Sequence, residues 1–270
     1  MGNVLTAKDN QAVKLYRKLA GNKKARIQEQ SFVLEGYRLV SDALKNGAEA
    51  TMLFITESAA EKYAGELSGI AGSSCRTLYI SDGLGEYIAE TECPQGVFAV
   101  CRIPREKKLS EFLENGRSFA VLHRLQDPGN AGMILRTADA LGMDGVIFCK
   151  SCDVYSPKVV RATMGSLFRV PVAVCSDEDE LFAELAKAGI KSDAAVVQGE
   201  AELAGSCSYP GGGRAVWIGN EGSGLTDEVI RRCERRITIP MQGNIESLNA
   251  AMAAGILMWE MTKGRMNKDA

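Results

Sequence analysis

The sequence predicts an α/β protein in which a small α/β domain precedes a larger domain built on a mostly parallel sheet. Short apolar segments of strand length alternate with helical patterns along most of the 270 residues, and this rhythm is stronger after residue 118. The composition, 46% hydrophobic and 24% charged, is ordinary for a globular chain that buries a sizeable core. These observations exclude a disordered, collagen-like or disulfide-stapled protein.

Residues 1–105 form the smaller predicted domain. Its basic segment around residues 14–27 carries apolar residues at near-helical spacing, so much of it is expected to be one helix, and a second helix is expected at 37–45. The predicted strands are 31–36, 51–56, 77–80 and 96–100. A charged, turn-rich stretch at 104–108 marks the boundary, and residues 106–117 are expected to be a linker.

Residues 118–270 form the larger predicted domain. The predicted strands are 118–122, 145–149, 169–175, 194–197, 215–219 and 236–239. The predicted helices are 130–141, 159–165, 178–188, 226–232 and 247–263, and Asn130, Thr226 and Ser247 are expected to cap three of them. Trp217 and Trp259 lie within apolar runs and are expected in the core. Short apolar strands joined by helices predict a parallel sheet covered on both faces, with ligands at the carboxyl ends of the strands.

One basic segment stands out in the smaller domain. It contains no acidic residue, although the whole chain has a net charge of −2. A solvated helix face and an RNA phosphate backbone are the two explanations for such a run, and this feature alone leaves both open. Its cations are Lys14, Arg17, Lys18, Lys23, Lys24 and Arg26.

Three loops at predicted strand ends carry unusual residues. The first is Asp-Pro-Gly-Asn at 127–130, a tight turn before the helix that contains Arg136. The second, at 219–224, has the order G-x-x-G-x-G, which matches neither the dinucleotide fingerprint nor a phosphate-binding P-loop. Its glycines allow backbone amides to meet a ligand, and Glu221 favours a cationic or zwitterionic one. In the third, 239–249, Pro240 ends a strand and small residues begin the last helix.

Taken in order, these loops resemble the three motifs of the SpoU/TrmH branch of the SPOUT methyltransferases, which methylate ribose 2′-hydroxyls of RNA. The matching stretches are DPGN with Arg136, GNEGSG at 219–224, and IPM at 239–241 with SLN at 247–249. The resemblance covers about residues 118–265. FVLEG at 32–36 and PQGV at 94–97 resemble signature stretches of the substrate-binding domain often found ahead of such enzymes, which is similar to ribosomal RNA-binding proteins.

The resemblance implies a trefoil knot in the C-terminal domain, S-adenosylmethionine as cofactor, and a homodimer with its active site near the subunit interface. The positions that match the cofactor pocket are Val197, Gly219, Ile239 and Leu248. Those that match catalytic or polar site positions are Asn130, Arg136, Glu221, Ser247 and Asn249. A further family-like stretch, 159–165, adds Arg161 as a candidate RNA contact.

The implied reaction is methyl transfer to a ribose 2′-hydroxyl in structured RNA, with rRNA preferred over tRNA as the substrate. Arginine normally stays protonated, so we interpret Arg136 as a clamp on the adjacent phosphate and hydroxyl rather than as a base. An idle RNA-binding or ribosome-assembly protein is one alternative. A nucleotide-dependent α/β enzyme is another, although the chain lacks either phosphate-loop pattern. The target nucleotide, and whether its methylation confers antibiotic resistance, stay open.

The sequence favours a metal-free, cytoplasmic protein. The eight cysteines are scattered and His123 is the only histidine, which does not suit a metal site. Cys149 and Cys152 form a C-x-x-C, for which a redox pair is the alternative to two reduced thiols. No apolar run reaches the roughly 18 residues of a membrane span, and no secretion signal is recognisable, so no membrane partner is expected.

Overall fold

The computed structural model describes residues 4–67, 75–197, 199–209 and 212–266 and divides into two compact units. The first unit comprises residues 1–105 and 155–168, and the second comprises 106–154 and 169–270. The segment 155–168 was expected in the second domain. It packs with the first because its helix α9 (Pro157–Ala162) buries Val159 and Val160 and contacts strand β1 (Ser31–Glu35).

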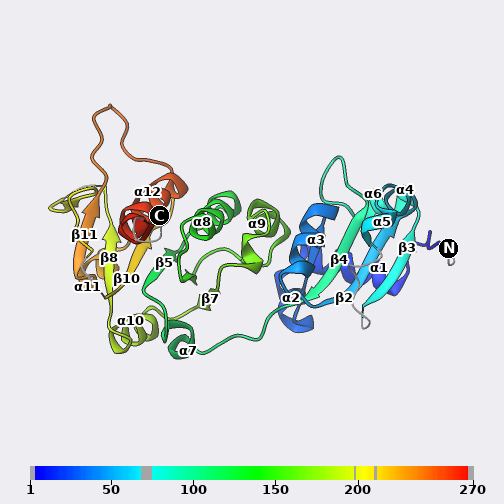
Figure 1. Ribbon diagram of the computed structural model, residues 1–270, viewed down its shortest axis with the longest axis horizontal. Helices are drawn as coiled ribbons and strands as arrows, with labels where there is room; N and C mark the ends of the chain where they lie inside the picture. The colour runs from blue at the N-terminus through cyan, green and yellow to red at the C-terminus, as the bar shows by residue number, and fades with distance from the viewer. Residues whose placement is uncertain (1–3, 68–74, 198, 210–211, 267–270) are drawn as a thin grey trace. The chain divides into compact units, whose positions relative to one another are not determined.

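The first unit contains a four-stranded mixed sheet in the order β1-β4-β2-β3 (Figure 1). β4 (Val97–Arg102) is antiparallel to β1 and to β2 (Ala50–Thr56), and β2 is parallel to β3 (Arg76–Ile80). All four expected strands are therefore present. The other helices of this unit are α1 (Gln11–Gly21), α2 (Lys23–Glu29), α3 (Tyr37–Lys45), α4 (Glu57–Lys62), α5 (Ala64–Leu67), α6 (Asp82–Ile88) and the 3-10 turn η1 (Ser166–Phe168).

The basic segment forms two helices rather than one. The break falls at Asn22, whose extended backbone ends α1 and whose side chain accepts a hydrogen bond from the Ala25 N–H to cap α2. The apolar face of α1 is anchored by Tyr16, which is fully buried and meets the rings of Phe54 and Phe98 edge-on at 5.6 and 5.7 Å. This packing leaves the basic residues of α1 on the outside.

The second unit contains a seven-stranded sheet in the order β7-β6-β5-β10-β8-β11-β9, and its pairings are all parallel. The predicted α/β class with a parallel sheet is therefore confirmed. The strands are β5 (Ser118–His123), β6 (Gly145–Cys149), β7 (Val172–Cys175), β8 (Ile190–Ala195), β9 (Glu202–Leu203), β10 (Gly213–Ile218) and β11 (Arg235–Thr238).

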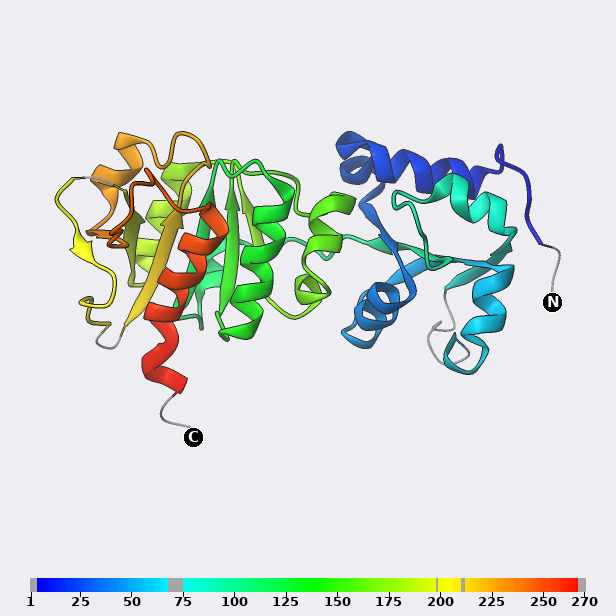
Figure 2. The same cartoon turned by 90° about the horizontal axis from the view of Figure 1, so that it is seen from above.

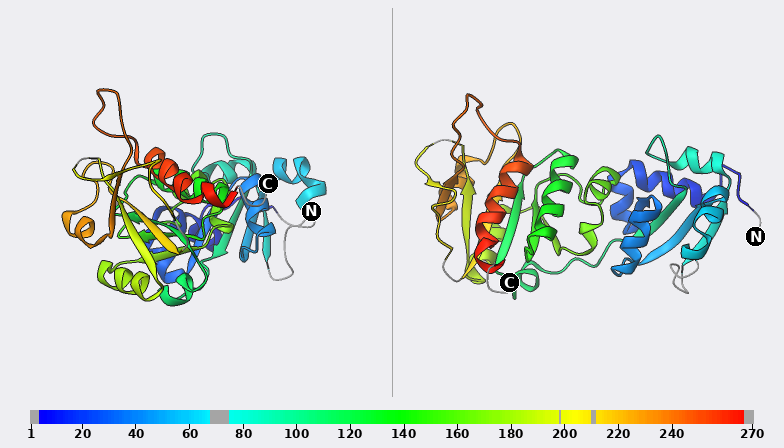
Figure 3. Two further views of the ribbon diagram at one scale, coloured as in Figure 1. Left: turned by 60° about the vertical axis from the view of Figure 1, so that its left-hand side comes forward. Right: turned by 45° about the horizontal axis from the view of Figure 1, so that its top comes forward.

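Helices cover both faces of this sheet. α8 (Pro128–Ala140) and α12 (Ala250–Met266) pack side by side on one face (Figures 2 and 3). On the other face, α7 (Leu109–Leu113), α10 (Glu178–Lys187) and α11 (Asp227–Arg232) pack around Trp217, whose buried ring stacks on Phe182 at 4.3 Å. Trp217 lies in the core as expected. The same expectation is wrong for Trp259, which is 48% exposed on α12.

Two predicted caps differ from the observed ones. α8 begins at Pro128 and is capped by Asp127, whose carboxylate accepts from the Asn130 N–H at 2.8 Å. α12 begins at Ala250 rather than 247, because the Asn249 side chain, not that of Ser247, accepts from the Ala251 N–H at 2.9 Å. The side chains of Asn130 and Ser247 are therefore not used as helix caps and are available for other contacts. Thr226 caps α11 as expected.

None of the helices in the described ranges is long and apolar enough to cross a membrane. In the same ranges, no three His, Cys, Asp or Glu side chains are grouped as a metal site would need. The eight cysteines are free thiols, and Cys149 on β6 lies opposite Cys175 on the neighbouring strand β7.

Candidate active site

A cavity of about 880 Å³ lies in the second unit, at the carboxyl ends of β8, β10 and β11. The loops that follow these strands supply most of its wall, as expected for a parallel sheet. The four predicted cofactor-binding residues, Val197, Gly219, Ile239 and Leu248, all line it. This volume is typical of a site for a ligand of cofactor size.

The glycine-rich loop at 219–224 is folded into a tight, self-bonded turn. Asn220 and Gly224 exchange backbone hydrogen bonds of 3.0 and 2.9 Å, and the φ angle of Gly224 is +66°. A side chain at Gly219 would place its Cβ 2.2 Å from the carbonyl carbon of Gly224, so only glycine fits there. The Asn220 side chain holds the turn by accepting from the N–H groups of Gly222 and Ser223.

Three polar residues from the three predicted loops meet beside this cavity. Asn130 donates from Nδ2 to the Glu221 carboxylate at 3.1 Å and accepts on Oδ1 from Asn249 Nδ2 at 2.9 Å. Because a carboxylate only accepts hydrogen bonds, Glu221 fixes which way the Asn130 amide points. Asn130 is 7% exposed and therefore nearly inaccessible to competing water.

Glu221 is held as a carboxylate. Burial raises its pKa, but the N–H donors of Asp127, Asn130 and Gln126 outweigh burial and hold the pKa below its ordinary value. Two of these donors are backbone N–H groups at the start of the first loop: that of Asp127 lies 2.9 Å from the Glu221 carboxylate, and that of the preceding residue, Gln126, lies 3.2 Å from it. Glu221 therefore clamps the first and second loops together and orients Asn130.

The remaining two predicted catalytic residues are placed differently. Ser247 lines the cavity. Arg136 is exposed on α8 and is absent from the cavity lining, and the described residues offer it no ion pair. It follows Asn130 by six residues, a rotation of about 240° around an α-helix, so the two side chains leave α8 on different sides.

The predicted RNA-binding residues of the first unit fall into two groups. Lys14, Arg17, Lys18, Lys23 and Lys24 are exposed on α1 and α2. Arg26 is only 5% exposed and donates to the carbonyls of Leu19 and Ala20, so it caps the end of α1 instead of facing solvent. We therefore remove Arg26 from the candidate RNA surface.

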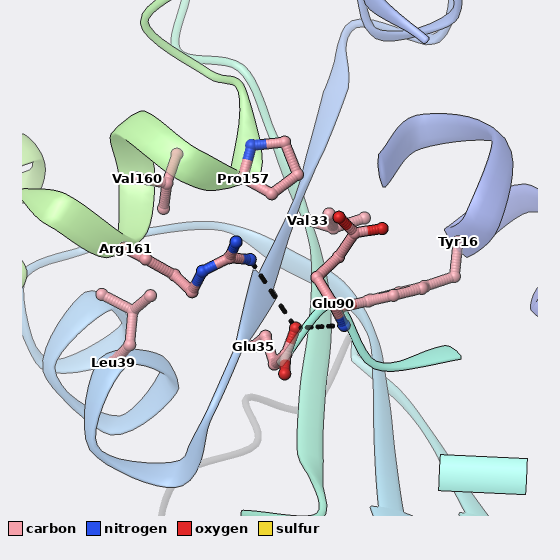
Figure 4. A pocket seen from close by; sticks show the side chains of 8 residues that line it. All are labelled: Tyr16, Val33, Glu35, Leu39, Glu90, Pro157, Val160 and Arg161. Atoms are coloured by element: carbon pink, nitrogen blue, oxygen red, sulfur yellow. Dashed lines mark hydrogen bonds and ion pairs between the residues drawn. The ribbon is translucent and has the colours of Figure 1, made fainter. Parts of the chain in front are cut away.

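Arg161 also has a protein partner. Its Nη1 atom lies 3.7 Å from a carboxylate oxygen of Glu35, which is buried and accepts from the N–H groups of Glu90 at 2.8 Å and Thr91 at 3.1 Å (Figure 4). Glu35 belongs to the FVLEG stretch. Arg161 thus fastens α9 within the first unit, although 26% of its side chain stays exposed.

Sequence comparison agrees with this geometry. A profile of the SpoU rRNA Methylase family matches residues 117–259, and a profile of the MRM3-like substrate binding domain matches residues 10–99. The first match covers more than half of the chain. The chain belongs to the SpoU rRNA methylase family.

Relatives of this SpoU-family chain align over nearly its whole length. The 23S rRNA (guanosine(2553)-2′-O)-methyltransferase RlmP of Bacillus subtilis is 34% identical, over 93% of this chain and 96% of the relative. The 23S rRNA (uridine(2479)-2′-O)-methyltransferase of Streptomyces viridochromogenes is 30% identical, over 93% of this chain and 89% of the relative. Both names describe enzymes that methylate 23S rRNA.

Solved structures show the same architecture. The AdoMet-bound rRNA methyltransferase from Sinorhizobium meliloti has a TM-score of 0.85 and 31% identity, covering 97% of this chain and 98% of that one. The SpoU methyltransferase AviRb from Streptomyces viridochromogenes, in complex with AdoMet, also has a TM-score of 0.85, with 28% identity and coverage of 95% and 98%. The α/β fold of this SpoU-family chain is thus one that binds AdoMet in both of these proteins.

Sequence reasoning missed several residues of the site. Asn220 organises the glycine loop and also donates to the Arg124 carbonyl at 2.9 Å, and an asparagine within a run of glycines was the available signal. Arg231 and Arg236 line the cavity. They belong to no motif, so only the folded chain reveals them.

Proposed function

We propose that this SpoU-family protein transfers a methyl group from S-adenosylmethionine to a ribose 2′-hydroxyl of ribosomal RNA. The observation that carries the proposal is the Asn130–Glu221–Asn249 cluster beside a cavity of cofactor size. The cluster unites three loops that are far apart in sequence, which a purely structural RNA-binding protein would not need. The names of the aligned relatives favour 23S rRNA over tRNA.

The cavity suits the cofactor chemically. Val197, Ile239 and Leu248 give apolar walls for an adenine ring, while Glu221 and Glu246 supply negative charge near a cationic group. When bound, S-adenosylmethionine supplies a methyl group on a sulfonium, which is electrophilic without further activation. The protein must therefore hold the two reactants in line more than it must activate them.

The chain's own residues would orient the acceptor. Asn130, locked between Glu221 and Asn249, presents a fixed amide at the start of α8. Ser247, which lines the cavity, would hydrogen-bond the ribose or the cofactor. Arg136 would clamp the phosphate beside the target ribose, and that phosphate would assist removal of the hydroxyl proton.

The location of Arg136 supports an active site shared between two copies of the chain. α8 and α12 expose four large apolar side chains, Met133, Met252, Ile256 and Trp259, with exposures of 49%, 55%, 36% and 48%. An apolar surface of this kind on adjacent helices is typical of a subunit interface. We propose that a second copy covers it and that Arg136 then serves the partner's cavity.

The proposal includes a trefoil knot in the second unit. The chain leaves β11 through the long loop at 239–249 and returns as α12, which contacts β5, β10 and α8 in the middle of the sheet (Figure 1). This return past the 219–224 loop supports a threaded chain. A knot would fix the cavity walls without requiring extra packing around them.

The first unit would bind the RNA. The match to a substrate binding domain and the exposed lysines and arginine of α1 and α2 support this role. The segment 106–117, which was expected to be a linker, belongs to the second unit, because Leu109 and Leu113 of α7 are buried in the core of that unit. The two aligned 23S rRNA methyltransferases come from bacteria, which supports a cytoplasmic site of action for this protein.

Labelled methyl transfer tests the proposal. The protein is incubated with methyl-labelled S-adenosylmethionine and either an unmodified 23S rRNA transcript or a tRNA transcript. We expect label in the rRNA, in a nucleotide whose 3′ linkage resists alkaline hydrolysis, because a 2′-O-methyl group blocks attack by the hydroxyl. Label on a base would contradict the proposal. Binding of S-adenosylhomocysteine without any transfer, or no binding at all, would favour the idle RNA-binding protein.

A further inference from the structure

Two arginines of the cavity wall are not used by the proposed reaction. Arg231 in α11 and Arg236 in β11 both line the cavity and are both exposed. Within the described ranges, no carboxylate forms an ion pair with either guanidinium. This is notable in a chain with 34 acidic residues and a net charge of −2.

The arginines next to them in sequence are neutralised. Arg232 pairs with Asp179 and lies 4.2 Å over the Phe182 ring. Arg235 pairs with the buried Asp193 at 2.8 Å and with Glu202 at 3.3 Å. Neither of these two lines the cavity. The free positive charge in this stretch is therefore confined to the two side chains that face the site.

We propose that Arg231 and Arg236 bind phosphate groups of the RNA substrate at the mouth of the cavity. This inference rests on the proposed function, since it assumes that RNA reaches the cavity. A guanidinium presents donors in a planar fork that matches two phosphate oxygens, and it keeps its charge at any physiological pH. The phosphates that flank the target ribose would then be held from α11 and β11.

An RNA phosphate suits these residues better than the carboxylate of the cofactor does. Both guanidiniums are exposed, so a large polyanion can reach them without entering the cavity. Carboxylates also line the cavity, namely those of Glu221, Asp227 and Glu246, so the overall field does not attract an anion. Direct contact with an arginine fork is therefore required, and it would fix the register of the RNA.

The test compares Arg231→Gln, Arg236→Gln and the double variant with the unchanged protein. RNA binding is measured with an unmodified 23S rRNA transcript over a range of salt concentrations, and cofactor binding is measured by calorimetry with S-adenosylhomocysteine. We expect RNA affinity to fall about tenfold per arginine. The slope of log affinity against log salt is negative, and it should become shallower by about 0.7 to 0.9 for each lost phosphate contact. S-adenosylhomocysteine affinity should stay unchanged.

Arg232→Gln is the matched control, because it removes a neighbouring arginine of the same helix that lies outside the cavity. It should leave RNA affinity and the salt slope unchanged. The inference is overturned if the double variant binds RNA like the unchanged protein. It is also overturned if S-adenosylhomocysteine binding is lost while RNA binding persists, because the anion is then the cofactor carboxylate. Failure of the unchanged protein to methylate RNA would count against the proposed function, whereas the binding comparison tests the phosphate contacts separately.

Discussion

Asn249 donates a hydrogen bond of 2.9 Å to Asn130 across 119 residues of sequence. The same Asn249 side chain caps α12 through the Ala251 N–H, and Asn130 in turn binds Glu221. The first turns of α8 and α12 are thereby tied to each other and to the glycine loop. A substitution of either asparagine should therefore alter the positions of all three loops.

Replacing the central amide should stop the reaction. In Asn130→Asp, a second carboxylate would face Glu221, and the pair would repel. We expect methyl transfer to fall at least about 100-fold, since small displacements of positioned groups cost that much. Gln126→Ala is the control, because Gln126 contacts Glu221 only through its backbone N–H at 3.2 Å. Near-normal transfer by the Asn130→Asp variant would remove this cluster from the mechanism.

Arg136→Lys should keep the charge and lose the fork that can bind phosphate and hydroxyl together. We expect turnover to fall about 100-fold while S-adenosylhomocysteine affinity is unchanged, because Arg136 does not line the cavity. Single-turnover kinetics with saturating RNA would measure the first quantity and calorimetry the second. Undiminished turnover would refute the clamp.

The shared active site predicts complementation between two inactive variants. Arg136→Ala and Glu221→Ala should each be inactive alone. If Arg136 serves the partner's cavity, each mixed dimer regains one intact site, so an equal, fully exchanged mixture should recover roughly a quarter of normal activity. Refolding the two chains together and measuring methyl transfer checks this. If the mixture stays inactive, either Arg136 acts in the site of its own chain or the protein does not form dimers.

The buried and exposed cations of the basic segment should behave in opposite ways. Arg26→Gln should lower the free energy of unfolding by roughly 1–3 kcal/mol, because two helix-end carbonyls lose a charged donor. Lys23→Gln with Lys24→Gln should leave stability within about 0.5 kcal/mol and weaken RNA binding with a shallower salt slope. Urea unfolding and salt-dependent RNA titration measure the two effects. An Arg26 variant with normal stability would contradict the capping role.

Acid should destabilise the second unit through Glu178. Burial raises the pKa of this carboxyl, but hydrogen bonds from His123 and Lys150 outweigh burial and lower the pKa from 4.5 to about 2. A depressed pKa stabilises the folded state above pH 4.5, and that stabilisation is lost as the pH falls toward 2. Glu178→Gln should flatten stability against pH in this window, whereas Glu184→Gln on the same helix should not. Urea midpoints from pH 6 to pH 2 provide the measurement.

The sequence was most informative where backbone geometry restricts the choice of residue. Gly219 and Gly224 predicted a tight loop, because almost no other residue fits at these two positions. The alternation of strands and helices predicted the parallel sheet. Local patterns could not show which side a charged residue faces. Arg26 is buried against carbonyls, and Trp259 is exposed although its neighbours are apolar. Long-range partners such as Asn130 and Asn249 became visible only in the folded chain.

Because of the segment 155–168, the two units of this protein cannot be separated by dividing its gene at one position. The two family profiles, 10–99 and 117–259, suggest modules joined in tandem that could be exchanged at one junction. The chain instead leaves the second unit after residue 154, contributes α9 to the first, and returns at residue 169. Dividing the chain at residue 105 would separate α9 from strand β1, which it contacts. Pro157, Val159 and Val160 of α9 would then lose the packing that buries them. A new RNA-binding half could therefore be grafted on only if this internal segment were redesigned with it.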